Sequence, residues 1–137
     1  MEFSLIDKSN YLKGLLIVAK KDNQLTEPEK KIIRSIAFRL GFAKDFYEET
    51  LKGLLANKYI VDTPIKFSDK KIAESFLLDG LRLAYSDGMV PEKEIDWLKL
   101  TASINEIKDE WFEDKLKKIK GMSNHSLNTE LSLFSII

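Results

Sequence analysis

The sequence predicts an all-α protein, a single-domain helical bundle, and three observations lead to this prediction. Apolar residues recur at intervals of three and four along nearly the whole chain, which is the spacing of one face of a helix. No stretch alternates apolar and polar residues as a half-buried strand would. The segments with helical spacing are separated by residues that end or interrupt helices, such as Gly41, Pro64 and Gly121.

The first half of the chain predicts three helices. Gly41 is expected to end the second of them in the left-handed conformation. A third helix is expected from about 43 to 57, and the stretch 58–67 predicts a linker, because the residue before Pro64 is pushed out of helical geometry. The residues expected to be buried on these three helices are Tyr11, Leu12, Leu15, Leu16 and Ala19; Ile32, Ile33, Ile36, Ala37 and Leu40; and Phe46, Tyr47, Leu51, Leu54 and Leu55.

The second half predicts three more helices and an apolar tail. Ser68 is the expected N-cap of a long fourth helix. A fifth helix follows the break at 87–88, and a sixth runs from about 108 to 120 and ends at Gly121. The tail is expected to dock on its own bundle, with a neighbouring chain as the alternative. The inward residues are Ala73, Phe76, Leu77, Gly80, Leu81 and Ala84; Ile95, Leu98 and Ala102; Phe112, Leu116 and Ile119; and, in the tail, Leu127, Leu131 and Phe134.

Length and composition limit the classes of function. A chain of 137 residues corresponds to one domain, 1–137. Its 22 basic and 22 acidic residues give no net charge, which argues against a nucleic-acid partner. The absence of cysteine excludes disulfides, thiolate metal sites and cysteine nucleophiles. No apolar run is long enough to span a bilayer, so we expect a cytoplasmic protein. No catalytic or organic-cofactor motif is present, so we expect a protein that is not an enzyme.

The chain contains an internal repeat at a constant shift of 65 residues. Residues 22–29, DNQLTEPE, align with residues 87–94, DGMVPEKE, without a gap. Two copies of one helical hairpin, about 10–41 and 75–104, followed by a helix and tail at 107–137, would have to bury their faces against each other. The flanking pairs are Leu12 and Leu77, Leu16 and Leu81, Ala19 and Ala84, Ile33 and Leu98, and Ala37 and Ala102.

The doubled pattern Leu-x-x-x-Leu-x-x-Ala-x-x-Asp-(Gly or Asn)-x-apolar-(Thr or Pro)-Glu-x-Glu resembles the TerB-like tellurite-resistance family over about residues 10–104. That resemblance implies an all-helical fold and a divalent cation bound by the acidic turns, with a role in metal, tellurite or envelope stress. The ligands it implies are Asp22, Glu29, Asp87 and Glu94. The chain departs from the family at Asn23, where glycine is usual, and it lacks the His-Pro-Asp tripeptide of the J-domain found in related co-chaperones.

The acidic turns have two interpretations. Thr26 and Glu29 have the spacing of a capping box, and acidic residues in a first turn are favoured by the helix dipole, so the turns can be structural caps. Alternatively, the carboxylates converge on Ca²⁺ or Mg²⁺, which prefer oxygen ligands. Asp79, two turns before Asp87, would then extend the acidic surface.

Two functions therefore remain open. The first is a non-catalytic module that binds or senses a divalent cation. The alternative is a protein–protein interaction domain in which the acidic turns act only as caps, and a protein partner is expected.

Overall fold

The computed structural model describes residues 2–21, 25–56, 62–86, 91–122 and 131–136, with the side chains of 54–56 excepted. Every regular element in these ranges is a helix, which confirms the predicted all-α class. The helices are α1 (Leu5–Lys20), α2 (Glu27–Arg39), α3 (Lys44–Ala56), α4 (Lys70–Tyr85), α5 (Glu92–Ile104), α6 (Asp109–Lys120) and α8 (Leu133–Ile136).

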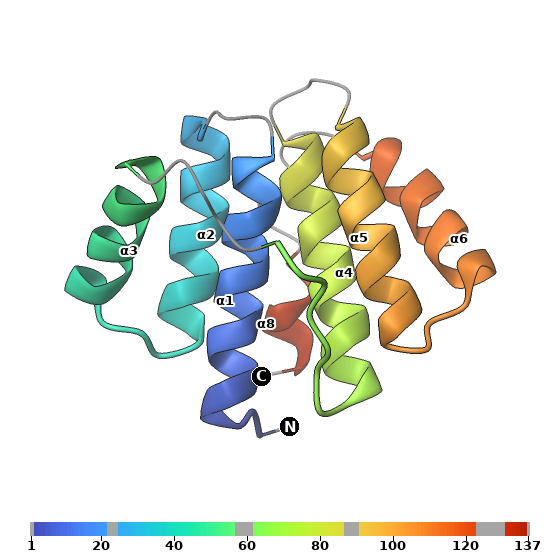
Figure 1. Ribbon diagram of the computed structural model, residues 1–137, viewed down its shortest axis with the longest axis horizontal. Coiled ribbons are helices and arrows are strands. Elements are labelled where there is room, and N and C mark those ends of the chain that lie inside the picture. Colours follow the sequence, from blue (N-terminus) through green and yellow to red (C-terminus); the bar gives the residue numbers. More distant parts are fainter. Residues whose placement is uncertain (1, 22–24, 57–61, 87–90, 123–130, 137) are drawn as a thin grey trace.

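The helices are arranged as two similar halves. Helices α1 and α4 run side by side and parallel through the centre, and each is flanked by the antiparallel helix that follows it, α2 or α5 (Figure 1). Helices α3 and α6 lie on the two outer sides (Figure 1). Because α1 and α4 make the most extensive contact in the molecule, the two halves bury their apolar faces against each other, as expected for a doubled hairpin.

The helix boundaries repeat at the same shift of 65 residues as the sequence. Helices α1 and α4 each have 16 residues and start at Leu5 and Lys70, while α2 and α5 each have 13 and start at Glu27 and Glu92. The correspondence also includes the third helices, which start at Lys44 and Asp109. The repeating unit in the structure is therefore a set of three helices.

The turn after the second helix has the same geometry in both copies. Gly41 has φ +89°, which confirms the predicted left-handed helix end, and the equivalent Glu106 has φ +60°. The N–H of Phe42 donates to the carbonyl of Ala37 at 3.0 Å, and the N–H of Ile107 donates to that of Ala102 at 3.0 Å. Glu106 adopts this conformation at a cost of about 1–2 kcal/mol, since a Cβ disfavours it.

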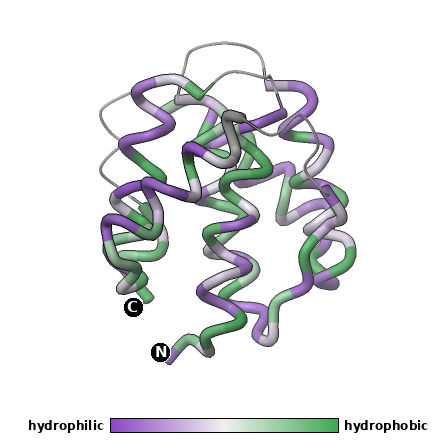
Figure 2. Tube along the Cα trace, turned by 60° about the vertical axis from the view of Figure 1, so that its left-hand side comes forward, coloured by the Kyte–Doolittle hydropathy of each residue, from purple (hydrophilic) through white to green (hydrophobic). Residues whose placement is uncertain are grey.

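One apolar core runs through the bundle. Hydrophobic and hydrophilic residues alternate in short bands along the helices (Figure 2), as expected when one face is buried and the other is solvated. All the inward residues predicted for the first, second and fourth helices are buried. Gly14 lets α1 approach α4 closely, because a Cβ there would lie 2.4 Å from Cζ of Phe76.

Two local predictions are wrong. Ser68 was the expected N-cap of α4, but the N-cap is Asp69, whose side chain accepts a hydrogen bond from the N–H of Lys71 at 2.7 Å. Ser68 instead donates hydrogen bonds from its hydroxyl and its N–H to the carboxylate of Asp7. Phe46, expected in the core, is 54% exposed, because the inward face of α3 is formed by Tyr47 and Leu51. Leu54 and Leu55 were also expected to be inward, but their side chains lie outside the described residues.

The linker and the tail cover the central helix pair. Ile65 and Phe67 of the linker are buried against the core. In the tail, Leu131 and Leu133 are buried and α8 contacts α4 and α2, so the described part docks on its own bundle as predicted. Phe134 is 41% exposed, and Leu127 lies outside the described residues. No described helix is long and apolar enough to cross a membrane.

Candidate functional site

The helix ends that flank the two acidic turns lie at the same end of the bundle. Helices α1 and α4 are parallel, and α2 and α5 run back in the opposite direction. The C-terminal ends of α1 and α4 therefore lie at the same end of the bundle as the N-terminal ends of α2 and α5 (Figure 1). Lys21, which caps α1, and Lys93, in the first turn of α5, line one cleft of about 520 Å³. Of the four predicted ligands, the structure describes Glu29 and Glu94, while Asp22 and Asp87 lie outside the described residues.

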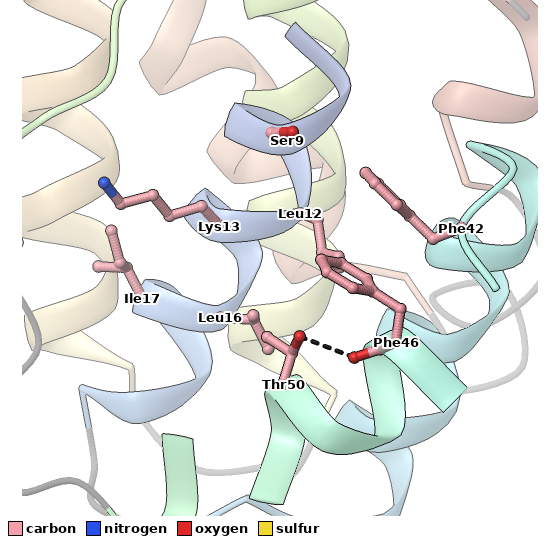
Figure 3. Close-up of a pocket in the computed structure, with 8 residues that line it drawn as sticks. All are labelled: Ser9, Leu12, Lys13, Leu16, Ile17, Phe42, Phe46 and Thr50. Carbon is pink, nitrogen blue, oxygen red and sulfur yellow. Dashed lines mark hydrogen bonds between the residues drawn. The ribbon is translucent and has the colours of Figure 1, made fainter. Parts of the chain in front are cut away.

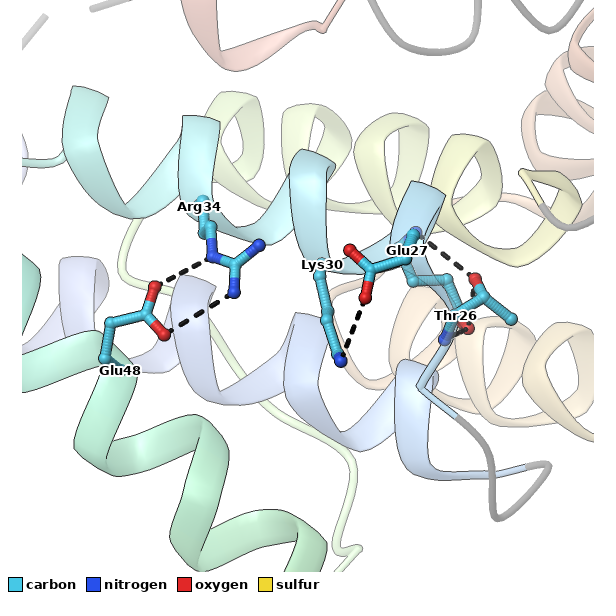
Figure 4. A network of polar contacts seen from close by, with 6 residues as sticks. Thr26, Glu27, Lys30, Arg34 and Glu48 are labelled. Carbon is cyan, nitrogen blue, oxygen red and sulfur yellow. Dashed lines mark hydrogen bonds and ion pairs between the residues drawn. The ribbon is translucent and has the colours of Figure 1, made fainter.

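Glu29 forms the capping box predicted from the sequence. Its Oε1 accepts hydrogen bonds from the N–H and the hydroxyl of Thr26, both at 2.9 Å, and the Glu29 N–H donates to Oγ1 of Thr26 at 3.3 Å. The residue is 1% exposed. At the surface of α2, Lys30 pairs with Glu27, and Arg34 pairs with Glu48 of α3 (Figure 4). The burial of Glu29 thus has a structural explanation in the cap.

Glu94 is equally buried, at 4% exposed, but has a different environment. The N-cap of α5 is Pro91, which has neither an N–H nor a hydroxyl, and it makes no side-chain cap hydrogen bond. The reciprocal cap of the first copy therefore cannot form in the second. Glu94 makes a polar or electrostatic contact of another kind. Within the described ranges, no three or more acidic or histidine side chains gather as metal ligands.

Asp79 does not extend the acidic surface, so that prediction is wrong. Its carboxylate is completely buried and accepts hydrogen bonds from the hydroxyl of Tyr11 at 2.6 Å and from the N–H groups of Ser132 and Leu133 at 2.5 and 3.0 Å. Nη1 of Arg82 lies 3.3 Å from Oδ1. Asp79 thus joins the two central helices to the tail that forms α8.

Burial dominates the electrostatics of this network. It raises the pKa of the Asp79 carboxyl above its ordinary value, although hydrogen bonds from Tyr11, Ser132 and Leu133 act in the opposite direction. Burial and the adjacent Asp79 charge raise the pKa of Tyr11 well above its ordinary value. The helical spacing from Ile72 and Phe76 to position 79 places Asp79 on an inward stripe, and this signal was available in the sequence.

Two surface depressions lie away from the acidic turns. A pocket of about 280 Å³ between α1 and α3 is lined mainly by apolar side chains (Figure 3). A broader groove of about 580 Å³ is lined by Phe38, Arg39, Phe134 and neighbouring residues of α2 and α3. Phe38 is 77% exposed, and the guanidinium of Arg39 lies over the ring of Phe134 at 5.6 Å from its centroid. Neither depression could be predicted from the sequence, because each depends on how α3 or the tail packs.

Comparison of the chain with family models, curated proteins and solved structures finds no match. The resemblance to the TerB-like family is carried by the residues of the doubled turn pattern.

Proposed function

We propose that this protein is a non-catalytic helical module that binds a divalent cation, Ca²⁺ or Mg²⁺, through its paired acidic turns. The proposed ligands are Asp22 and Glu29 from the first copy and Asp87 and Glu94 from the second. The observation that carries the proposal is that Glu29 and Glu94 are buried at equivalent positions in the first turns of α2 and α5, two helices whose N-terminal ends lie at the same end of the bundle. Such a site would bind metal in a TerB-like manner, consistent with a role in metal or tellurite stress.

The two copies of the acidic turn differ in how the buried glutamate can be capped. A capping box explains the burial of Glu29, but Pro91 prevents the same explanation for Glu94. Carboxylates that converge repel one another, and a divalent cation shared between the copies would supply the compensating charge. The helix dipoles of α2 and α5 would favour the carboxylates but oppose the cation, so several oxygen ligands are required.

Thermal unfolding with and without ion tests the proposal. The protein is freed of metal with EDTA, then melted in increasing CaCl₂ or MgCl₂, with NaCl used to keep the ionic strength constant. A ligand that binds only the native state at ten times its Kd stabilises it by about 1.4 kcal/mol. For a domain of this size, the expected increase in Tm is about 5 °C.

The double variant Asp87→Asn with Glu94→Gln should lose the ion-dependent increase. Glu92→Gln is the matched control, because Glu92 is an exposed acidic residue in the same first turn of α5 and should leave the increase intact. Absence of any shift at millimolar ion would refute the proposal, as would an unchanged shift in the double variant.

A role as a protein–protein interaction domain is the second candidate. It is supported by the groove that contains Phe38, Arg39 and Phe134, since exposed aromatic and arginine side chains are enriched at the energetic centres of interfaces. Phe38→Ser should abolish binding of a co-purifying protein without lowering Tm, because the side chain is 77% exposed. Retention of that protein by the variant would exclude this groove as its binding surface.

A further inference from the structure

The pocket between α1 and α3 has a defined shape. Leu12 and Leu16 of α1 form its floor, Ile17 and the stem of Lys13 border one side, and Phe42 and Phe46 form the opposite wall (Figure 3). The two phenylalanine rings are stacked, with centroids 5.4 Å apart. The side chain of Phe46 is 54% exposed, so this apolar wall could bury the hydrocarbon part of a ligand.

The second copy of the repeat has different side chains at two of the equivalent positions. A shift of 65 residues places Leu78 at the position of Lys13 and Trp111 at that of Phe46. Both Leu78 and Trp111 pack against the core, and α6 contacts α4 more extensively than α3 contacts α1. At these two positions the first copy therefore has a smaller aromatic ring and a cation in place of a leucine.

The lining carries one kind of charge. Among the described residues that line the pocket, Lys13 alone is ionisable. No carboxylate of the described residues lies within ion-pair distance of its ammonium group. The hydroxyl of Thr50 already donates to the carbonyl of Phe46 at 2.8 Å, so it is occupied within α3. The pocket thus combines apolar walls with a single available positive charge at its edge.

We propose that this pocket binds a small amphipathic anion, consisting of a medium-length acyl chain with one carboxylate. The acyl chain would lie on Leu12 and Leu16 against Phe46, and the carboxylate would pair with Lys13. At about 30 Å³ for each non-hydrogen atom, a volume of about 280 Å³ holds about nine or ten such atoms, which is the size of octanoate. This inference does not depend on the proposed cation site, which lies at the turn end of the bundle.

Three probes with the same chain and different head groups test the charge requirement. The full chain, labelled with ¹⁵N, is titrated with octanoate, octan-1-ol and octylammonium, and chemical shifts are followed by NMR. Saturable chemical-shift changes are expected in α1 and α3. Octanoate should bind about fivefold more tightly than octan-1-ol, because one exposed ion pair contributes about that much affinity, and octylammonium should bind most weakly. Binding of octan-1-ol as tight as that of octanoate would overturn the proposal, as would saturable shifts confined to other helices or no saturable shift with octanoate.

Variants then separate the charge from the pocket. Lys13→Gln should weaken the binding of octanoate about fivefold and leave the binding of octan-1-ol unchanged. Lys13→Arg should restore octanoate binding. Lys31→Gln, at an exposed position of α2, is the control for loss of a positive charge. Ser9→Trp at the rim should weaken both probes at least tenfold by filling the space, whereas Glu74→Trp, at the equivalent position of the second copy, should weaken neither. Unchanged octanoate binding in Lys13→Gln or Ser9→Trp would overturn the assignment.

Discussion

Asp79→Asn is expected to destabilise the protein strongly and to detach the tail. The substitution preserves the size of the side chain but replaces one acceptor oxygen by a donor NH₂ group. In the structure both oxygens accept hydrogen bonds, from the hydroxyl of Tyr11 and from the N–H groups of Ser132 and Leu133. At least one of these donors would therefore face another donor in a site with no solvent exposure.

The magnitude follows from the character of the lost contacts. A hydrogen bond to a charged group contributes about 1.5–3 kcal/mol, and leaving a buried donor unsatisfied costs about 1–3 kcal/mol. Arg82, whose side chain is 12% exposed, would also lose its ionic partner. We therefore expect the free energy of unfolding to fall by about 3–5 kcal/mol, a large part of the 5–15 kcal/mol that is usual for a domain.

Urea unfolding followed by circular dichroism measures this loss. With an m value of about 2 kcal/mol/M, the midpoint should fall by about 1.5–2.5 M. Hydrogen exchange supplies a second readout, because the amides of Ser132 and Leu133 should lose their protection before the amides of α4 do. Asp114→Asn is the control, since Asp114 is an exposed acid that pairs with Lys118 on the surface and should matter by less than about 0.5 kcal/mol.

A double-mutant cycle identifies the network as the cause. Tyr11→Phe removes only the hydroxyl that donates to Asp79, so its effect should be much smaller in the Asp79→Asn background than in the wild type. Strict additivity of the two losses would refute the network, and so would a loss below about 1 kcal/mol for Asp79→Asn with unchanged exchange at Ser132 and Leu133.

Three further predictions follow from the packing and the hydrogen bonds. Gly14→Ala should lower the free energy of unfolding by about 1–3 kcal/mol, because its Cβ would lie 2.4 Å from Cζ of Phe76, and urea unfolding checks this. Gly53→Ala should raise it by about 0.5–1 kcal/mol in the same assay, since the residue lies exposed in α3 and no atom of the described residues lies within 4 Å of an added Cβ; a loss would contradict this. Burial acts to raise the pKa of Asp7, but hydrogen bonds led by those from Ser68 outweigh it and lower the pKa below 3.8. The stabilisation by Asp7 is therefore present above that pH and is lost as the pH falls through the lowered pKa. Asp7→Asn should weaken this loss of stability in acid, and an unchanged stability profile below pH 4 would refute the prediction.

Asp79 should have the opposite pH dependence. Its pKa is raised in the folded state, mainly by burial, so the native protein binds this proton more readily than the unfolded chain does. The contribution of Asp79 to stability therefore falls as the pH rises from about 3.8 through the raised pKa and is constant above it. The difference in unfolding free energy between wild type and Asp79→Asn, measured by urea unfolding at several pH values above 3.8, should show this fall, and a difference independent of pH would contradict it.

The features predicted correctly from the sequence depend on neighbours within a few residues. The inward faces of α1, α2 and α4 follow from a spacing of three and four, and the capping box of Thr26 and Glu29 spans a single turn. The left-handed Gly41 follows from the conformational freedom of glycine at the end of a helix. The repeat was also accessible, because two copies of one unit keep the same local pattern.

Errors arose where a side chain has two possible partners. Asp69 and Ser68 are both good helix caps, and only the approach of Asp7, 61 residues earlier than Ser68, decides that the serine pairs with that carboxylate. Phe46 fits an inward helical face by spacing, but α3 presents Tyr47 and Leu51 to the core instead.

The sequence by itself determined the helical class, the positions of most helix ends and the doubling of the unit, because hydrogen bonds and periodicity within a helix are local. The tertiary structure alone decided that Asp79 binds the tail, that the first turns of α2 and α5 lie at one end of the bundle, and that a pocket lined by Lys13 opens between α1 and α3. These features depend on contacts between residues that are distant in the chain, and the packing of whole helices fixes such contacts.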